Sequence, residues 1–359
     1  MYKRSIWIIF SCIAVLITIF LSSCSTGYPL GIKDKPIKKA INYMYGAQSP
    51  DGSIGSYSDT AWSVMALSAS GNNPEAFGSP SPVDYLSQNN DQLIESFNLT
   101  ADLSRNILAI IAAGKNPESF GNGNTVVPEG DYISALIALH DGQQFGAIES
   151  LNEDFWAILA LVAAGYTQED EIISSTASYI IDNQGPDLGW SWATPNNEWY
   201  YDSDPDNTAA AIMALVRAGM RSDNPSIINA IEYLKTTQGD TGGFVSYGLE
   251  NTSSTAWVMA ALSIVGEDPS AWVKNGYSPV NYLLSMQDED GSFSFASPLP
   301  EGYLAMPEKT TADSIVALLG CGYPVHYSCT ANWWLWIILV MLIASMITFL
   351  SLNARKRWK

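Results

Sequence analysis

One helix ending recurs six times along this chain, and this repeat limits the possible folds more than any other feature. Each copy is a run of alanine, leucine and other apolar residues that stops at a glycine, and successive glycines lie 43 to 56 residues apart. Glycine in the left-handed conformation commonly ends an α-helix, and repeats of this length are typical of stacked helical hairpins. The six copies stop at Gly71, Gly114, Gly165, Gly219, Gly266 and Gly322.

Each repeat is predicted to contain two helices with different surroundings. The first helix carries an apolar stripe around a tyrosine, such as Ile41, Tyr43 and Met44 in the first copy. The second begins at a serine, threonine or aspartate, residues that cap free N–H groups. It is then apolar on nearly every side, which is typical of a buried helix. The second helices are therefore expected to form an inner layer, and six uninterrupted hairpins are enough to close a ring.

A turn motif joins the two helices in four of the six copies. It runs from a glutamine through Asp and Gly residues to a bulky apolar residue, and it is lost in the second and third copies, although their inner helices persist. The four copies are Gln48–Ile54, Gln184–Trp190, Gln238–Phe244 and Gln287–Phe293.

This turn, followed by Ser/Thr-Ala-Trp and an Ala-Leu helix, resembles the QW motif of squalene–hopene cyclases. The chain is thus similar to the terpenoid cyclase and protein prenyltransferase superfamily over roughly four fifths of its length. The resemblance implies an all-α fold, an (α/α)6 toroid of six helical hairpins that spans residues 35–323. It also implies that the second helix of each hairpin lines a central cavity.

The segment from Asp204 to Ala209 resembles the Asp-x-Asp-Asp-Thr-Ala motif of class II terpene cyclases. In that family the middle aspartate is the general acid that protonates an alkene or epoxide, which requires a carboxyl kept protonated by its surroundings. The resemblance implies that Asp206 is this acid and Asp204 its neighbour. Two features depart from the family: Asn207 stands at the third position, and the chain has room for one ring only, where the family places its site between helical domains.

Two alternatives for these carboxylates stay open. In the first, Asp206 caps an inner helix, as Asp59 or Asp154 would do in their own copies. In the second, Asp202, Asp204 and Asp206 gather oxygen ligands around a calcium ion.

Several aromatic and charged residues are expected at the mouth where the inner helices begin. Converging aromatic side chains with a few polar groups are typical of a ligand pocket. The predicted ligand-binding residues are Trp62, Arg105, Trp156, Trp199, Tyr200 and Trp257. The alternative is that the tryptophans only pack on neighbouring hairpins. Because the chain has two histidines, His140 on a first-type helix and His326 near the C-terminus, the sequence predicts no zinc site.

Residues 1–24 are typical of a secretory signal peptide. Lys3 and Arg4 precede an apolar run, and small residues follow it up to Cys24. The sequence around Cys24 also resembles the lipobox of bacterial lipoproteins, which would make Cys24 a lipidated N-terminus. Residues 25–34 are then expected to be a linker to the ring.

Residues 333–352 form an uncharged apolar run. At about 1.5 Å per residue in a helix, the run is long enough to span a hydrocarbon core. Residues 353–359 are basic and are expected to stay in the cytoplasm, which places the ring on the extracytoplasmic face of the cell membrane. Cys321 and Cys329 would then lie outside the cytoplasm, and the sequence leaves open whether they form a disulfide or stay as two thiols.

The net charge of −19 argues against a nucleic-acid partner, since phosphate contacts need a basic surface. The sequence favours a membrane-anchored toroid without catalytic activity that binds a small apolar molecule, a polysaccharide or a partner protein. The first alternative is a class II, squalene–hopene-like cyclase with Asp206 as general acid. A further alternative is a carbohydrate-active toroid, which needs two carboxylates across an open cleft.

Overall fold

The computed structural model describes residues 27–197 and 202–325 of the chain. None of the helices within these ranges is long and apolar enough to cross a membrane. Outside them lie the predicted signal peptide, lipidation at Cys24, the ligand-binding Trp199 and Tyr200, Cys329, the transmembrane helix 333–352 and the basic tail.

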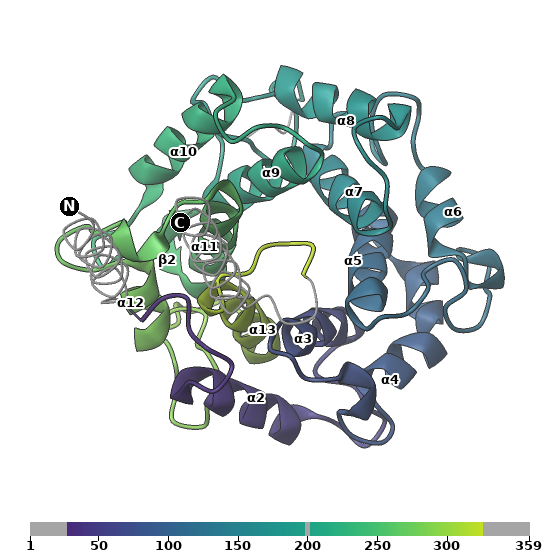
Figure 1. Cartoon of the computed structure of the whole chain (residues 1–359), viewed down its shortest axis with the longest axis horizontal. Coiled ribbons are helices and arrows are strands. Elements are labelled where there is room, and N and C mark those ends of the chain that lie inside the picture. The colour runs from purple at the N-terminus through teal and green to yellow at the C-terminus, as the bar shows by residue number, and fades with distance from the viewer. Residues whose placement is uncertain (1–26, 198–201, 326–359) are drawn as a thin grey trace, which may run out of the picture. The chain divides into compact units, whose positions relative to one another are not determined.

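Twelve helices form two concentric layers in the described part of the chain (Figure 1). The inner layer consists of α3 (Tyr57–Ala69), α5 (Leu99–Ala112), α7 (Leu151–Ala163), α9 (Pro205–Arg217), α11 (Thr252–Val265) and α13 (Pro307–Leu318). The outer layer consists of α2 (Lys35–Ala47), α4 (Pro82–Gln88), α6 (Tyr132–Ile137), α8 (Glu171–Asp182), α10 (Pro225–Thr237) and α12 (Pro279–Ser285). Each inner helix packs on the next, and α13 packs on α3, so the ring closes. The predicted α/α toroid is therefore confirmed.

Shorter elements occupy the connections between these helices. A two-stranded antiparallel hairpin, β1 (Phe244–Ser246) and β2 (Leu249–Asn251), leads into α11. The 3-10 helices are η1 (Pro74–Ala76), η2 (Asn90–Glu95), η3 (Pro128–Gly130) and η4 (Pro269–Ala271).

The burial of each helix follows from its sequence pattern. In α9 every residue from Asn207 to Leu215 is buried, because small and branched apolar side chains face neighbours on all sides. In α8 only Ile173, Thr176 and Ile180 are buried, at the spacing of a single helical stripe. The apolar core therefore lies within the inner layer and between the two layers.

The repeated glutamine of the turn motif joins each hairpin to the next. The Gln238 side chain donates to the carbonyl oxygens of Gly242, 3.2 Å away in its own turn, and of Trp272, 2.8 Å away after the next inner helix. Gln287 makes the same kind of bond across the point of ring closure, to Pro36 at 2.8 Å. The motif thus recurs because each copy supplies one cross-link of the ring.

Replacing Gln238 with alanine is expected to lower the free energy of unfolding by about 1–3 kcal/mol, because two buried carbonyls lose a donor. Urea denaturation of the full chain measures this change. The exposed Gln143 offers a matched control, and Gln143→Ala should change stability by less than about 0.5 kcal/mol. Equal losses in the two variants would contradict a cross-linking role for Gln238.

The bulky residue that ends the turn motif is held by a hydrogen bond from its backbone N–H to a side chain near the start of the inner helix. The backbone N–H of Phe244 donates to the Thr255 hydroxyl at 2.9 Å, and that of Trp190 donates to Thr208 at 2.9 Å. The third repeat keeps this geometry with another residue, since Phe145 N–H donates to the Asp154 carboxylate at 2.7 Å. Asp154 therefore does not cap its helix; it replaces a threonine.

Two sequence predictions need correction. His140 does not lie on a helix: α6 ends at Ile137, and His140 follows in the turn, where its Nε2 lies 3.2 Å from the Thr176 hydroxyl of α8. The sixth inner helix stops at Gly320, whose φ is 68°, and not at Gly322. Gly322 serves another purpose, because a side chain there would clash with Ile264 on α11.

The two ends of the ring meet beside α13. The Leu30 backbone N–H donates to the Leu318 carbonyl at 2.8 Å. The Tyr28 hydroxyl donates to the Ala317 carbonyl at 3.1 Å and lies 2.9 Å from the Ser263 hydroxyl of α11. Part of the segment predicted as a linker thus packs on the ring.

Candidate functional site

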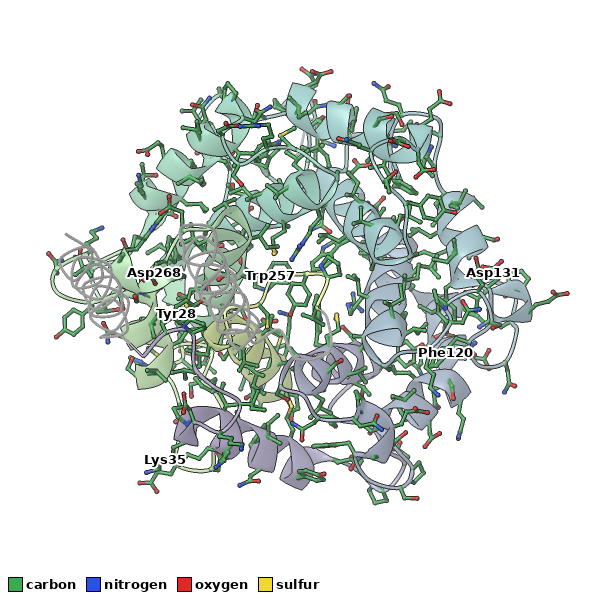
Figure 2. The ribbon with its side chains drawn as sticks, viewed as in Figure 1. Tyr28, Lys35, Phe120, Asp131, Trp257 and Asp268 are labelled. Carbon is green, nitrogen blue, oxygen red and sulfur yellow. The ribbon has the colours of Figure 1, made fainter. Side chains whose placement is uncertain are left out.

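Three tryptophans from alternate inner helices meet inside the ring. Trp62, Trp156 and Trp257 occupy the same position in α3, α7 and α11, so the helices bring them to one level. Their ring centroids are 4.9 to 5.7 Å apart in edge-to-face pairs, and all three are buried. Figure 2 marks Trp257 on the inner layer, in contrast to Asp131 on the outer one. The predicted convergence of these tryptophans is present.

A tyrosine that is not among the predicted ligand-binding residues completes this cluster. The chain turns back into the ring after α13, and the Tyr323 ring centroid lies 5.5 Å from that of Trp62 and 5.4 Å from that of Trp257. Arg217, the last residue of α9, donates from Nε to the Tyr323 carbonyl at 3.4 Å. Because Arg217 ends α9, Tyr323 covers the tryptophans from the end of the ring where the inner helices finish.

Two cations lie over the aromatic cluster. The Arg105 guanidinium carbon is 5.8 Å from the Trp62 centroid, and the Lys309 Nζ is 5.2 Å from Trp62 and 5.7 Å from Trp257. Lys309 also pairs with Asp313 at 2.6 Å on α13. The Asp313 side chain is buried, and its Oδ1 has no hydrogen-bond partner among the described residues. The faces of Trp62 and Trp257 thus already accommodate a positive charge.

The cap of α9 is Asp204, so the alternative that Asp206 caps this helix is wrong. Asp204 Oδ1 accepts from the Asn207 backbone N–H at 2.9 Å, and Oδ2 accepts from the Asn207 side-chain amide at 2.7 Å. Burial, together with the nearby Asp206 carboxylate, raises the pKa of Asp204 to about 6. Asn207, the departure from the cyclase motif, therefore holds Asp204 in place.

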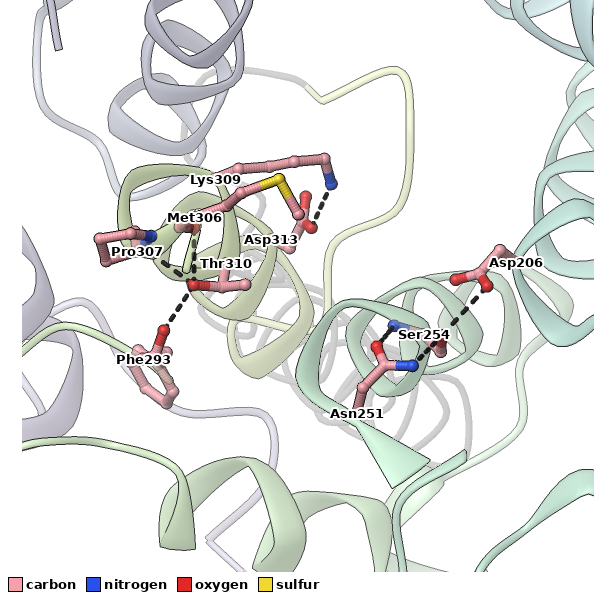
Figure 3. Close-up of polar contacts among 9 residues, drawn as sticks. All are labelled: Asp206, Asn251, Ser254, Phe293, Met306, Pro307, Lys309, Thr310 and Asp313. Carbon is pink, nitrogen blue, oxygen red and sulfur yellow. Dashed lines mark hydrogen bonds and ion pairs between the residues drawn. The ribbon is translucent and has the colours of Figure 1, made fainter. Parts of the chain in front are cut away.

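Asp206 points into the ring from the first turn of α9. Its Oδ2 accepts from the Ser246 hydroxyl of β1 at 2.7 Å and from the Ser254 hydroxyl of α11 at 3.0 Å. Figure 3 shows Asp206 directed toward α11, with Lys309 and Asp313 on the neighbouring α13. Burial raises the pKa of Asp206 and the Asp313 charge adds to this, against the lowering effect of the two serines and Lys309. A carboxyl in this setting favours its protonated form, which is what a proton donor requires.

The calcium alternative gains no support from the described residues. They contain no group of three or more carboxylate, histidine or cysteine side chains that could hold a metal. Asp204 and Asp206 engage different partners, and Asp202 is exposed. Cys321 is buried, and its predicted disulfide partner lies outside the described residues.

The ring of six hairpins, with an acidic motif opening its fourth inner helix, defines a terpenoid cyclase-like α/α toroid. No protein-family model matches the sequence. A segment of the chain is 30% identical over 144 residues to a squalene–hopene cyclase of Zymomonas mobilis, covering 36% of this chain and 20% of that protein. A squalene–hopene cyclase of Bradyrhizobium diazoefficiens is 30% identical over 132 residues, or 33% of this chain and 19% of that protein. The matched part thus spans about a fifth of these relatives.

Solved structures share the whole ring. The type II terpene cyclase MstE from Scytonema superposes with a TM-score of 0.54 at 18% identity, covering 79% of this chain and 96% of that one. A glycosidase variant superposes with a TM-score of 0.57 at 11% identity, covering 79% and 95%. These likenesses confirm the fold. Nearly all of the MstE chain is covered by this ring.

Proposed function

We propose that this protein is a class II terpene cyclase-like toroid that binds an isoprenoid inside the ring and protonates it with Asp206. The observation that carries the proposal is the setting of Asp206. This carboxyl lies inside the ring, has a raised pKa and is held only by hydroxyl groups among the described residues. It also stands at the position of the middle aspartate in the class II motif.

The chemistry divides between the carboxyl and the aromatic cluster. Asp206 would transfer its proton to one carbon of an alkene, or to an epoxide oxygen, and leave a carbocation on the neighbouring carbon. A tryptophan face stabilises a cation through its quadrupole, and Lys309 already shows a cation over Trp62 and Trp257. The cation is then attacked by a further alkene of the same molecule, and loss of a proton to water gives a neutral cyclic product.

The isoprenoid is expected to enter this site from one end of the ring. Tyr323 covers the tryptophans where the inner helices finish, and Asp206 lies where they start. The relatives support an apolar ligand of this kind: a variant of MstE was solved in complex with geranylgeranyl dihydroxybenzoate, its substrate.

The test is to incubate the full chain with squalene or geranylgeranyl dihydroxybenzoate in D₂O and to analyse the extracted lipids by mass spectrometry. We expect a cyclised product that carries one deuterium, because the initiating proton comes from an exchangeable carboxyl. A bound but unchanged isoprenoid without deuterium would contradict the cyclase proposal.

That outcome would instead favour the non-catalytic binding toroid. One observation supports this second candidate: Trp62, Trp156, Trp257 and Tyr323 pack against one another at the centre of the ring. The comparisons nevertheless support the cyclase interpretation better. A carbohydrate-active site has less support, because Asp313, which faces the same interior, is buried in an ion pair with Lys309.

A further inference from the structure

A side chain near the start of each inner helix marks the same position in every repeat. In five repeats it accepts the backbone N–H of the bulky turn residue, as Thr255 and Thr311 do at 2.9 Å. In the second repeat the Ser104 hydroxyl donates to the carbonyl four residues earlier, just as Thr60 and Thr255 do. The six equivalent residues are Thr60, Ser104, Asp154, Thr208, Thr255 and Thr311.

Counting from this position shows which side chains face the interior of the ring. The residues two places after it include the three tryptophans that meet there, and they are called the tryptophan level: Trp62, Asn106, Trp156, Ala210, Trp257 and Asp313. The residues two places before it lie on the same helix face one turn nearer the helix start, because the two positions are four residues apart. They are called the entry level: Ser58, Asp102, Asn152, Asp206, Ser253 and Lys309.

Every side chain of the entry level is polar. Five of the six residues are partly exposed, and Ser253 is 9% exposed. One turn beyond the tryptophan level the same helix faces carry only buried apolar residues, which are Ala66, Ile110, Ala160, Ala214, Ala261 and Ala317. A ligand that enters where the inner helices begin therefore meets polar groups before it meets aromatic ones.

Buried acceptors without a partner lie at these two levels. Asn106 and Asp313 are 0% and 3% exposed, and Oδ1 of each has no hydrogen-bond partner among the described residues. The Ser253 hydroxyl oxygen is in the same situation. Because a buried acceptor without a donor costs free energy, a ligand that donates hydrogen bonds at this place would be favoured.

The charges around these acceptors are balanced. Lys309 pairs with Asp313, and Arg105 pairs with Asp102, each at 2.6 Å. Figure 3 shows the first of these pairs on α13, with Asp206 on the other side of α11. A cationic ligand would be repelled by the lysine and the arginine, and an anionic one by the carboxylates. A hydroxyl group is neutral and can both donate and accept, so it matches this mixture of groups.

We propose that the ligand of this ring is neutral and carries at least two hydroxyl groups on the end that lies beside Asp206, over the tryptophans. The hydroxyl groups donate to Oδ1 of Asn106 and of Asp313, and they become accessible when the flexible Arg105 and Lys309 side chains that cover Trp62 turn aside. A plain hydrocarbon would leave these acceptors unpaired. The inference rests on the proposed function only for the isoprenoid nature of the ligand's tail.

Two probes with the same apolar tail test the proposal. 1-O-geranylgeranylglycerol has two hydroxyl groups, and its 2,3-di-O-methyl ether keeps the oxygens but donates no hydrogen bond. Binding of each probe to the full chain in a mild detergent is measured by calorimetry. The unmodified chain is expected to bind the diol at least about tenfold more tightly than the ether. Equal affinities would overturn the proposal, because buried water would then satisfy the acceptors.

Substitutions show whether the preference for the diol comes from these acceptors. Asn106→Leu removes one acceptor with little change in volume and should lower the diol-to-ether affinity ratio at least about threefold. Lys309→Met with Asp313→Leu replaces the second acceptor and its ion-pair partner by apolar groups and should lower the ratio as well. Partition of the probes into detergent cancels, since the same two probes are compared in every variant.

A matched variant removes buried hydroxyl groups elsewhere on the same helices. Ser63 and Ser314 also lack a partner among the described residues, and each lies one residue past the tryptophan level. Ser63→Ala with Ser314→Ala should leave the affinity ratio within about twofold. A loss of preference equal to that of Asn106→Leu would contradict the proposal, and so would tighter binding of geranylgeranylamine or geranylgeranyl phosphate than of the diol.

Catalysis is a separate outcome of these experiments. Preferential binding of the diol without deuterium incorporation in D₂O would contradict the proposed cyclase and leave this inference standing. Cyclisation of squalene by a chain that shows no preference for the diol would overturn this inference and leave the proposed function standing.

Discussion

Replacement of Asp206 by asparagine is expected to reduce isoprenoid turnover by a factor of about 10² to 10⁴, the usual contribution of a general acid. Asparagine has nearly the same shape and its carbonyl oxygen can accept from the Ser246 and Ser254 hydroxyls, as Oδ2 of Asp206 does. What it lacks is the transferable proton. The variant should therefore bind the isoprenoid, fail to cyclise it and incorporate no deuterium.

The raised pKa of Asp206 determines whether this substitution stabilises or destabilises the folded chain. Burial raises the pKa of Asp206 above its ordinary value of 3.8, so the folded chain holds this proton more tightly than the unfolded chain. The native state then loses stability as the pH rises above about 4. Asp206→Asn removes this loss and is expected to be at least as stable as the unmodified chain at pH 8, which denaturation in urea would show.

Neighbouring aspartates provide the controls for this loss of activity. Asp202→Asn changes an exposed carboxylate two residues before the cap and should leave turnover within about twofold. Asp204→Asn can still cap α9, but it replaces the oxygen that accepts from the Asn207 side-chain amide with an N–H donor, so it should affect stability more than turnover. Normal turnover in Asp206→Asn, measured on folded protein, would show that the proton comes from another group.

The repeated pattern of residues was sufficient to predict the ring. A glycine stop, a glutamine turn and an apolar second helix recur along the chain, and each has a local physical role that needs no distant information. The level at which Trp62, Trp156 and Trp257 meet also follows from the sequence, because each occupies the same position in its helix.

Other parts of the site depend on contacts that a local pattern does not encode. Tyr323 lies beyond the last repeat, and it reaches the tryptophans only because Gly322 allows the chain to pass close to α11. The roles of Asp204 and Asp206 depend on where α9 begins. If the helix began two residues later, Asp206 would be its cap and Asp204 would lie outside it. A hydrogen-bond partner such as Ser246 comes from another repeat, so the sequence motif alone could not reveal it.

The second substitution with a large expected effect is at Asp154 in the third repeat, and it changes the pH dependence of stability. Asp154 is fully buried and accepts one hydrogen bond, from the Phe145 N–H, while its Oδ2 has no partner among the described residues. Burial raises the pKa of Asp154 from 3.8 to about 8, and the nearby charges of Glu153 and Asp141 act in the same direction. Thr60, Thr208 and Thr255 perform the equivalent role in other repeats without a titrating group.

Asp154→Thr is therefore expected to stabilise the protein, by an amount that depends on pH. Below about pH 4 both the folded and unfolded chains hold the Asp154 proton, and the carboxyl contributes no pH dependence. Between about pH 4 and pH 8 only the folded chain retains it, so the native state loses about 1.4 kcal/mol per pH unit, or about 6 kcal/mol in total. Above about pH 8 the loss is complete.

Threonine keeps the bond to Phe145 and removes the titration, so the free energies of unfolding of the two proteins should diverge steadily from about pH 4 to pH 8. Urea denaturation of the full chain at a series of pH values measures the difference, and other titrating groups cancel because both proteins share them. The reciprocal variant Thr255→Asp, placed where Phe244 donates its N–H, should introduce the same loss of stability in the fifth repeat. Parallel curves for the unmodified chain and Asp154→Thr would mean that Asp154 is already ionised in the folded protein. The cost of its burial would then have to be offset by solvent that reaches the third repeat.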